Sequence, residues 1–301
     1  RIATVIVGQE QTVDLVLTAV LANGHVLLEG VPGVAKTLLA RLVARLIEAD
    51  FSRIQFTPDL MPSDVLGTTV FNMKTNDFDF HQGPVFADIV LVDEINRAPA
   101  KTQAALFEVM EERQVSIDGT THQMGELYTI LATQNPVEQE GTYKLPEAQL
   151  DRFLMKITMG YPSLEEEVDI LERHHTNASL VKLDSLAPVL TKEELLSLRR
   201  LMERVFVDRT LLQYIALIVQ QTRTSKAVYL GASPRASVAM MQASKAYALL
   251  QGRDFVTPED IKFVAPYVLQ HRLILTAEAE MEGYSPVKVT QRLIDKVEVP
   301  K

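Results

Sequence analysis

The stretch that decides the fold is His25-Val-Leu-Leu-Glu-Gly-Val-Pro-Gly-Val-Ala-Lys-Thr37. A short apolar run leads into a glycine-rich turn, and the turn ends in Lys36 and Thr37 at the head of a helix-like segment. This order predicts a strand, a phosphate-binding loop and a helix, because such a loop directs backbone N–H groups and the positive helix end at a phosphate. Lys36 would meet the β- and γ-phosphates of a nucleotide, and the Thr37 hydroxyl would hold Mg²⁺. The residues expected to contact the nucleotide are Gly30, Val31, Pro32, Gly33, Val34, Ala35, Lys36, Thr37 and Leu38.

The loop departs at one position from the usual spacing of a phosphate-binding loop. Ala35 stands where the last glycine of G-x-x-x-x-G-K-T is usual. An alanine there costs strain if the backbone needs a positive φ, and costs nothing if the position is already helical. The alternative interpretation of the whole stretch is a glycine-containing turn between a strand and a helix that binds no ligand.

The composition is that of a globular protein with room for one large or two ordinary domains. The 301 residues are 47 % hydrophobic and 23 % charged, which does not fit a disordered chain. No apolar run approaches the roughly 20 residues that span a bilayer, so we expect no membrane insertion and a cytoplasmic location. The absence of cysteine excludes disulfides and thiolate metal sites. A net charge of −9 makes nucleic acid an unlikely partner for the surface as a whole.

A second strong signal is the run Ala-Asp-Ile-Val-Leu-Val-Asp-Glu at 87–94. Four consecutive apolar residues fit a central strand of a parallel sheet, and its end is where such sheets place ligands. With a phosphate loop upstream, Asp93 would complete the Mg²⁺ shell and Glu94 would polarise the attacking water. The alternative is an acidic strand end that faces solvent.

The remaining signals up to residue 161 predict a doubly wound parallel sheet, because strands and helices alternate. Strands are expected at 51–58, 127–133 and 154–158, and helices at 9–22, 38–47 and 99–113. Asn135 follows one of these strands, where its amide could hold a water against a γ-phosphate or form an Asx turn before proline.

Two hairpins interrupt the alternation. Short strands around 68–71 and 78–80 flank a polar turn at 74–77, and Asp118-Gly119 lies in the middle of the alternating segment 114–122. An Asp-Gly pair between alternating strands is a strong hairpin signal.

Strand signals become rare after Pro162, and we predict a nucleotide-binding domain at 1–161 and a helical domain at 162–301. Ser233-Pro234-Arg235 is typical of a helix start. Arg235 opposes the helix dipole there, so the pattern indicates an anion, either a bound phosphate or a nearby carboxylate. His174-His175 has no third ligand at helical spacing, which favours a solvated helix end over a metal site. Helices are expected at 164–174, 192–205, 210–222, 234–250 and 258–269.

Five motifs in this order make the sequence resemble the AAA+ ATPases and, within them, the MoxR family. The motifs are Gly30-Val-Pro-Gly-Val-Ala-Lys-Thr37, Gly83-Pro-Val-Phe-Ala-Asp-Ile-Val-Leu-Val-Asp-Glu-Ile-Asn-Arg-Ala98, Ala132-Thr-Gln-Asn-Pro136, Leu145-Pro-Glu-Ala-Gln-Leu-Asp-Arg-Phe153 and Gly231-Ala-Ser-Pro-Arg235. The resemblance implies an AAA+ module, in which an α/β domain with a doubly wound parallel sheet is followed by an all-helical lid domain. It also implies that the hairpins are the helix-2 insert and the pre-sensor-1 hairpin.

The same resemblance implies a role for each site residue. Residues 30–37 would be Walker A, and Asp93 and Glu94 would be Walker B. Asn135 would be sensor 1, Arg235 would be sensor 2, and Arg152 would be an arginine finger that reaches the nucleotide of the next subunit. The catalytic set is therefore Glu94, Asn135, Arg152 and Arg235, with ATP and Mg²⁺ bound by the loop, Thr37 and Asp93.

A MoxR-type protein would be a chaperone-like ATPase that works as a homo-oligomeric ring, expected to be a hexamer. It would remodel or mature a client enzyme complex, including metal loading, with a partner that carries a von Willebrand A (VWA) domain. The alternative is a nucleic-acid motor like the MCM helicases, which share both hairpins. That alternative predicts basic hairpin tips, but no Lys or Arg lies between 115 and 124, and the first hairpin offers only Lys74. A nucleotide-gated scaffold without hydrolysis is a further alternative, against which Glu94 and Arg152 argue.

Overall fold

The strand that precedes the glycine-rich loop lies in a five-stranded sheet with the order β2-β5-β8-β1-β9. The computed structural model describes residues 2, 5–31, 33–136, 142–175 and 186–300. β2 pairs in parallel with β5, and β5 with β8, as the alternating sequence pattern predicts. The strands are β1 (His25–Gly30), β2 (Phe51–Gln55), β5 (Ile89–Asp93), β8 (Thr129–Gln134) and β9 (Phe153–Met159).

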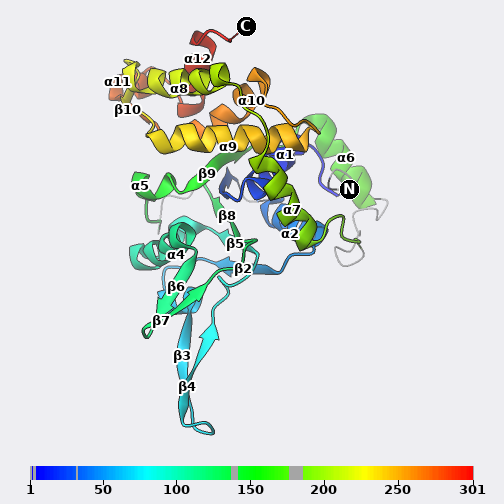
Figure 1. Cartoon of the computed structure of the whole chain (residues 1–301), viewed down its shortest axis with the longest axis vertical. Helices are drawn as coiled ribbons and strands as arrows, with labels where there is room; N and C mark the ends of the chain where they lie inside the picture. The colour runs from blue at the N-terminus through cyan, green and yellow to red at the C-terminus, as the bar shows by residue number, and fades with distance from the viewer. Residues whose placement is uncertain (1, 3–4, 32, 137–141, 176–185, 301) are drawn as a thin grey trace. The chain divides into compact units, whose positions relative to one another are not determined.

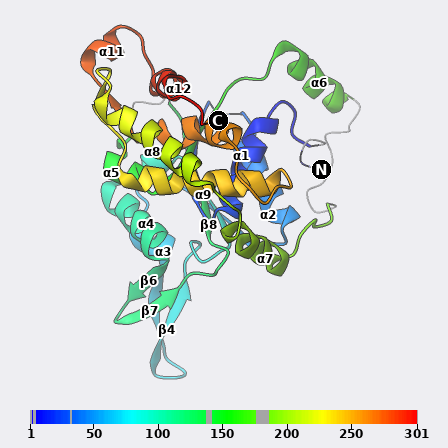
Figure 2. The same cartoon turned by 45° about the horizontal axis from the view of Figure 1, so that its top comes forward.

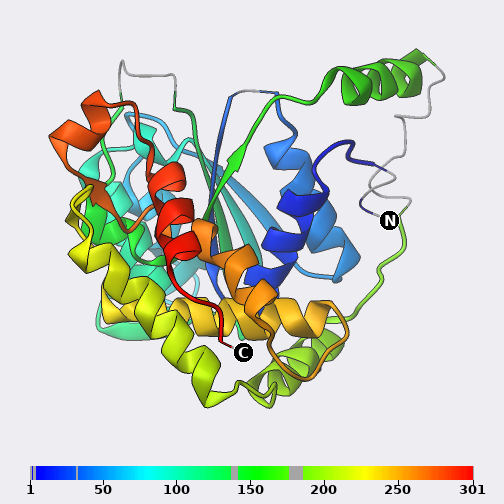
Figure 3. The same cartoon turned by 90° about the horizontal axis from the view of Figure 1, so that it is seen from above.

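The central strands are buried, which explains their apolar runs. Every residue of β5 is buried, and so is every residue of β8 except its last. Parallel strands that are covered on both faces have no solvent side to place polar residues on. Figure 3 shows α2 (Lys36–Leu46) beside the sheet, and this helix contacts β2 and β5. The other elements of this part are α1 (Glu10–Leu21), α3 (Pro62–Leu66), η2 (Ile95–Arg97), α4 (Ala100–Glu112), α5 (Glu147–Leu150) and α6 (Leu164–His175).

Both predicted hairpins are present, and they lie side by side (Figures 1 and 2). The first pairs β3 (Gly67–Asn72) with β4 (Asp77–Gln82), and the second pairs β6 (Gln114–Ile117) with β7 (Thr120–Gln123). Asp118 and Gly119 form the tight turn with φ of 49° and 80°, as a two-residue hairpin loop requires. The rings of Phe80 and His122 stack at a centroid distance of 4.2 Å, so the two hairpins also contact each other.

The chain forms two compact units, and each unit is assembled from three separate segments of the sequence. The first comprises residues 1–13, 27–145 and 158–196, and the second comprises 14–26, 146–157 and 197–301. β1 and β9 are therefore each divided between the units. The boundary that we placed at residue 161 stays a prediction.

The second unit is mainly helical, as predicted, and it adds a small ribbon. α9 (Pro234–Leu250) carries several buried alanines, and it packs against α10 (Pro258–Leu269). β10 (Val228–Leu230) and β11 (Ile274–Leu275) form an antiparallel pair that the sequence pattern did not reveal, because its two strands are short and far apart in the chain. Besides α5, the helices that lie wholly in this unit are α8 (Arg209–Thr224), α9 (Pro234–Leu250), α10 (Pro258–Leu269), α11 (Ala277–Met281) and α12 (Pro286–Lys296), whereas α1 and α7 (Lys192–Glu203) are divided between the units.

Membrane insertion was not expected from the sequence. Within the described residues, the helices all fall short of the length or the apolar character that a bilayer crossing requires.

Candidate nucleotide site

The loop between β1 and α2 has the backbone that a phosphate-binding loop needs. Gly30 is the last residue of β1, and its backbone lies so close to Met159 that an added Cβ would be 2.8 Å from the Met159 carbonyl oxygen. Gly33 has a φ of 92°, a region that favours glycine. The Lys36 ammonium donates a hydrogen bond to the Gly30 carbonyl at 2.6 Å, so this side chain closes the loop on itself. Pro32, which we also assigned to the loop, lies outside the described residues.

Ala35 adopts the conformation in which an alanine is strained. Its φ of 60° and ψ of 22° are left-handed, and it occupies the N-cap position of α2. A non-glycine residue pays roughly 1–2 kcal/mol in this region because Cβ crowds the carbonyl oxygen. The structure therefore selects the strained alternative that the sequence left open.

Helix α2 begins at Lys36 and points its positive end at the loop. No acidic residue occurs in its first turn, so no carboxylate of that turn neutralises the helix dipole. Thr37 and Leu38 follow in the same turn. This end of the helix is therefore suited to an anion such as a phosphate.

Asp93 ends β5 and is almost fully buried, with 7 % of the residue exposed. Its Oδ1 accepts a hydrogen bond from the Thr133 hydroxyl at 3.1 Å, and its Oδ2 accepts one from Arg53 Nε at 2.6 Å. The Arg53 side chain itself is 45 % exposed. Asp93 is thus oriented from two sides, by a neighbouring strand and by a cation that reaches solvent.

Glu94 directly follows β5 and has a left-handed backbone, with φ of 56° and ψ of 50°. Its N–H donates to the Thr133 hydroxyl at 3.0 Å, which fixes this conformation. Its carboxylate accepts from the Gln55 amide at 2.9 Å and forms an ion pair with Arg97 at 3.2 Å. Backbone strain held in place by surrounding contacts is common at functional sites.

Sequence reasoning did not assign roles to Thr133, Gln55 or Arg53. Thr133 lies in the Ala-Thr-Gln-Asn-Pro motif, and this position in the motif was the available signal. The other two residues carry no local signal, because only the pairing of β2 with β5, with Gln55 opposite Asp93, brings them to this edge.

Asn135 follows β8, the strand next to β5 in the sheet, and it is 6 % exposed. β1 is the next strand after β8, so the sheet order places the ends of β5, β8 and β1 in sequence along one edge. The structure therefore brings the loop, Asp93, Glu94 and Asn135 to neighbouring positions within the first unit.

The oxygens at this edge fit the chemistry of Mg²⁺. That ion prefers oxygen ligands, and in nucleotide sites it uses one or two protein oxygens together with phosphates and waters. The Asp93 carboxylate and the Thr37 hydroxyl are such oxygens. Within the described part of the chain, no three His, Asp or Glu side chains gather as a metal cage, so a site here would need the phosphate oxygens as well.

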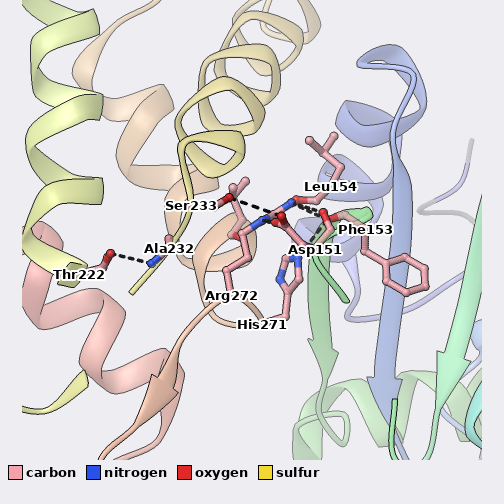
Figure 4. A network of polar contacts seen from close by, with 9 residues as sticks. Asp151, Phe153, Leu154, Thr222, Ala232, Ser233, His271 and Arg272 are labelled. Carbon is pink, nitrogen blue, oxygen red and sulfur yellow. Dashed lines mark hydrogen bonds and ion pairs between the residues drawn. The ribbon is translucent and has the colours of Figure 1, made fainter. Parts of the chain in front are cut away.

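The two predicted arginines, Arg152 and Arg235, belong to the second unit. Arg152 is half-buried and directly precedes β9, whereas Arg235 is exposed in the first turn of α9. The Ser233 side chain does not cap the helix backbone; its hydroxyl instead contacts the Asp151 carboxylate at 3.5 Å (Figure 4). A carboxylate thus lies near the start of α9, but its ion pair is with Arg272, so the anion that offsets Arg235 stays a prediction.

Comparison with known proteins places this geometry in a family. The family model described as "ATPase family associated with various cellular activities (AAA)" matches residues 25–155, and the AAA lid domain model matches residues 220–295. Chaperone MoxR1 of Mycobacterium tuberculosis is 46 % identical over an alignment of 310 positions, which covers 100 % of this chain and 81 % of the relative. The chain belongs to the MoxR family of AAA+ ATPases.

Other relatives of this MoxR-family ATPase agree. Protein MoxR of Methylorubrum extorquens is 33 % identical, over 93 % of this chain and 88 % of the relative. Protein YeaC of Bacillus subtilis, described as uncharacterized, is 50 % identical over 100 % of this chain and 93 % of the relative. A crystal structure from Cytophaga hutchinsonii, whose protein is assigned as an ATPase, superposes with a TM-score of 0.90 at 42 % identity, over 100 % of this chain and 93 % of that chain. The predicted fold, an α/β module with a helical lid, is confirmed.

Proposed function

We propose that this MoxR-family protein binds ATP with Mg²⁺ and hydrolyses it to ADP and phosphate. Residues 30–38 would hold the phosphates, with the Lys36 ammonium turned from the Gly30 carbonyl toward the β- and γ-phosphates. Thr37 and Asp93 would hold Mg²⁺, which when bound neutralises charge on the phosphate oxygens. The observation that carries the proposal is the position of Glu94, whose backbone is fixed by Thr133 and whose carboxylate is held by Gln55.

Glu94 would orient the attacking water and accept its proton. A carboxylate that performs this task must lie at a fixed position, because the attack requires alignment with the leaving oxygen. The Thr133 hydroxyl joins Asp93 and Glu94 through one atom, at 3.1 and 3.0 Å. We infer that this hydroxyl fixes the position of Asp93, the proposed metal ligand, relative to Glu94, the proposed water-activating group. The Asn135 amide would hold the same water from the end of the neighbouring strand.

Arg152 and Arg235 would complete the charge balance on the γ-phosphate. We propose that Arg235 acts on the nucleotide of its own chain and Arg152 on that of the next subunit in a homo-oligomeric ring, expected to be a hexamer. A finger supplied in trans typically changes turnover by about 10³–10⁵-fold, so assembly would be part of the mechanism.

The work done with this energy would be the remodelling of a protein client. The first hairpin exposes apolar side chains near its tip, including Met73 at 89 % and Phe78 at 66 % exposure. Exposed apolar groups of this kind fit a protein surface better than a phosphate backbone. We propose a client enzyme complex as the substrate, maturation or metal loading as the outcome, a VWA-domain partner, and a cytoplasmic setting.

Turnover is tested by phosphate release with and without Mg²⁺. Lys36→Ala should abolish nucleotide binding and phosphate release, because the loop loses its cation. Lys101→Ala, an exposed lysine on α4, is the matched control and should behave as the unaltered protein. Release that continues after chelation of Mg²⁺, or that survives Lys36→Ala, would contradict the proposal.

The ring mechanism is tested by mixing inactive subunits. Arg152→Ala subunits keep their own nucleotide loop, and Lys36→Ala subunits keep their finger, so mixed rings should recover part of the activity. No recovery at any mixing ratio would overturn the trans role.

The class of client, protein or nucleic acid, is tested by substituting residues of the first hairpin and by adding DNA to the turnover assay. Met73→Ser combined with Phe78→Ser should reduce the proteins captured in the presence of ATP and leave basal turnover unchanged. Stimulation of turnover by DNA would instead favour a nucleic-acid motor.

A further inference from the structure

Arg272 lies between α10 and β11 in the second unit, and its guanidinium is buried, with 4 % of the side chain exposed. A guanidinium has five N–H donors and no acceptor. Five hydrogen bonds match this number, and Figure 4 shows how the side chain lies among most of its partners. The acceptors are Asp151 Oδ1 at 2.5 Å, the Asp151 carbonyl at 3.0 Å, the Phe153 carbonyl at 2.8 Å, the Leu154 carbonyl at 3.2 Å and the Val268 carbonyl.

Four of these five acceptors belong to residues 151–154, and this segment contains Arg152. The guanidinium is planar and rigid, so it holds the acceptors in a fixed relation to one another. The fifth acceptor, the Val268 carbonyl, belongs to the last turn of α10. The main chain on both sides of Arg152 is thereby tied to the end of one helix.

The two residues before Arg272 strengthen this connection. His271 lies with Nε2 3.0 Å from the Phe153 carbonyl, and the Gln270 amide donates to the Lys156 carbonyl. Burial and the neighbouring Arg272 charge lower the pKa of His271 well below its usual value, so the ring is neutral at pH 7 and Nε2 donates its hydrogen. Three consecutive side chains, 270–272, therefore bind the backbone of residues 151–156.

We propose that Arg272 is a positioning residue for Arg152: it sets the place and direction from which the finger reaches the neighbouring nucleotide. This inference rests on the proposed ATP hydrolysis. An apolar contact would hold the segment without imposing a direction, whereas charge-assisted hydrogen bonds add geometric specificity. A displacement of only about 1 Å at a catalytic group can cost about 10²-fold in rate.

Arg272→Lys tests this role, because lysine keeps the charge and loses the planar fork. We expect turnover to fall by about 10²-fold while ATP binding is retained. Adding Lys36→Ala subunits should restore activity as it does for Arg152→Ala. The matched control is Arg253→Lys, which disrupts another two-point ion pair of the same unit, with Asp260 at 2.5 and 2.7 Å.

Hydrogen exchange of the amides at 151–154 gives a readout that needs no turnover. Exchange should become faster in Arg272→Lys and stay unchanged in Arg253→Lys. Equal turnover and equal exchange in the two variants would overturn the inference, and so would a loss that Lys36→Ala subunits fail to restore. If the unaltered protein releases no phosphate but the exchange difference is present, the proposed reaction fails and the anchoring of the segment stands.

Discussion

The ion pair of Asp93 with Arg53 in the first unit and that of Asp151 with Arg272 in the second are built in opposite ways. In the pair of Asp93 with Arg53 the carboxylate is buried and the arginine is 45 % exposed. In the pair of Asp151 with Arg272 the arginine is 4 % exposed and the carboxylate 22 %. The N–O distances are nearly equal, 2.6 and 2.5 Å, so distance alone does not distinguish them.

The difference in arginine exposure determines which of the two ion pairs can dissociate. The proposed magnesium site requires Arg53 to turn into solvent and free the Asp93 carboxylate, and the exposed guanidinium can replace this hydrogen bond with one to water. Arg272 cannot leave, because four other hydrogen bonds would break inside the protein. We infer that the first pair is an exchangeable contact and the second a permanent one.

Removing each arginine gives the largest expected contrast in stability. Arg272→Met should lower the free energy of unfolding by about 3–5 kcal/mol, the range for breaking a buried pair. Arg53→Met should cost about 1 kcal/mol or less, because the arginine is exposed and Asp93 keeps its Thr133 bond. Urea unfolding followed by circular dichroism measures both. Similar losses of unfolding free energy in the two variants would contradict the distinction between an exchangeable and a permanent ion pair.

Neutralising each aspartate should change turnover in the opposite order: the first pair should show the larger effect, whereas the second shows the larger effect on stability. Asp93→Asn should reduce phosphate release by about 10²-fold, because the proposed Mg²⁺ ligand loses its charge. Asp151→Asn should reduce it by about tenfold or less, since Arg272 keeps its carbonyl acceptors. Steady-state rates at saturating Mg²⁺ test this, and an Asp151→Asn defect larger than that of Asp93→Asn would contradict it.

The free energy of unfolding should also depend on pH through His271, the residue that precedes Arg272. Its pKa is lowered in the folded state by burial first and then by the charges of Arg272 and Lys156. A lowered folded pKa gives stability that is complete above the unfolded value near 6.5 and is lost as pH falls below it. Stability should therefore fall by about 1 kcal/mol per pH unit between pH 6.5 and 5.5. His271→Gln should flatten this part of the urea-midpoint profile, and an unchanged slope would contradict the assignment.

The smallest effect on stability is expected at Ala35, which lies at the same edge of the sheet as the exchangeable pair of Asp93 with Arg53. Ala35→Gly relieves about 1–2 kcal/mol of strain but adds about 0.4–1 kcal/mol of unfolded-state entropy. The net gain should be about 1 kcal/mol or less in thermal unfolding. Ala35→Val is the control and should destabilise, because a β-branched side chain tolerates positive φ poorly. A glycine variant less stable than the alanine protein would argue against the strain.

The sequence revealed the parts of the site that depend on local patterns. The strand, loop and helix around Lys36 follow from an apolar run, glycines and a helix start, and Asp93 and Glu94 follow from a buried strand with two carboxylates at its end. The two hairpins were equally local, since Asp118-Gly119 determines its own turn.

The rest could not be predicted because it depends on distant segments. Gln55 reaches Glu94 only through strand pairing, and Arg272 binds Asp151 from 121 residues away. Nothing in the neighbourhood of either residue distinguishes it from an ordinary surface side chain. The positive φ of Ala35 was likewise undecided until the backbone was known.

The central claim, that this edge of the sheet hydrolyses ATP, is tested most directly by Glu94→Gln in a phosphate-release assay with ATP affinity measured in parallel. Glutamine keeps the size of the side chain and its contact with Gln55 but cannot accept a proton. The account predicts ATP affinity within about threefold of the unaltered protein and turnover lower by at least about 10²-fold. Turnover at the unaltered rate would contradict the account.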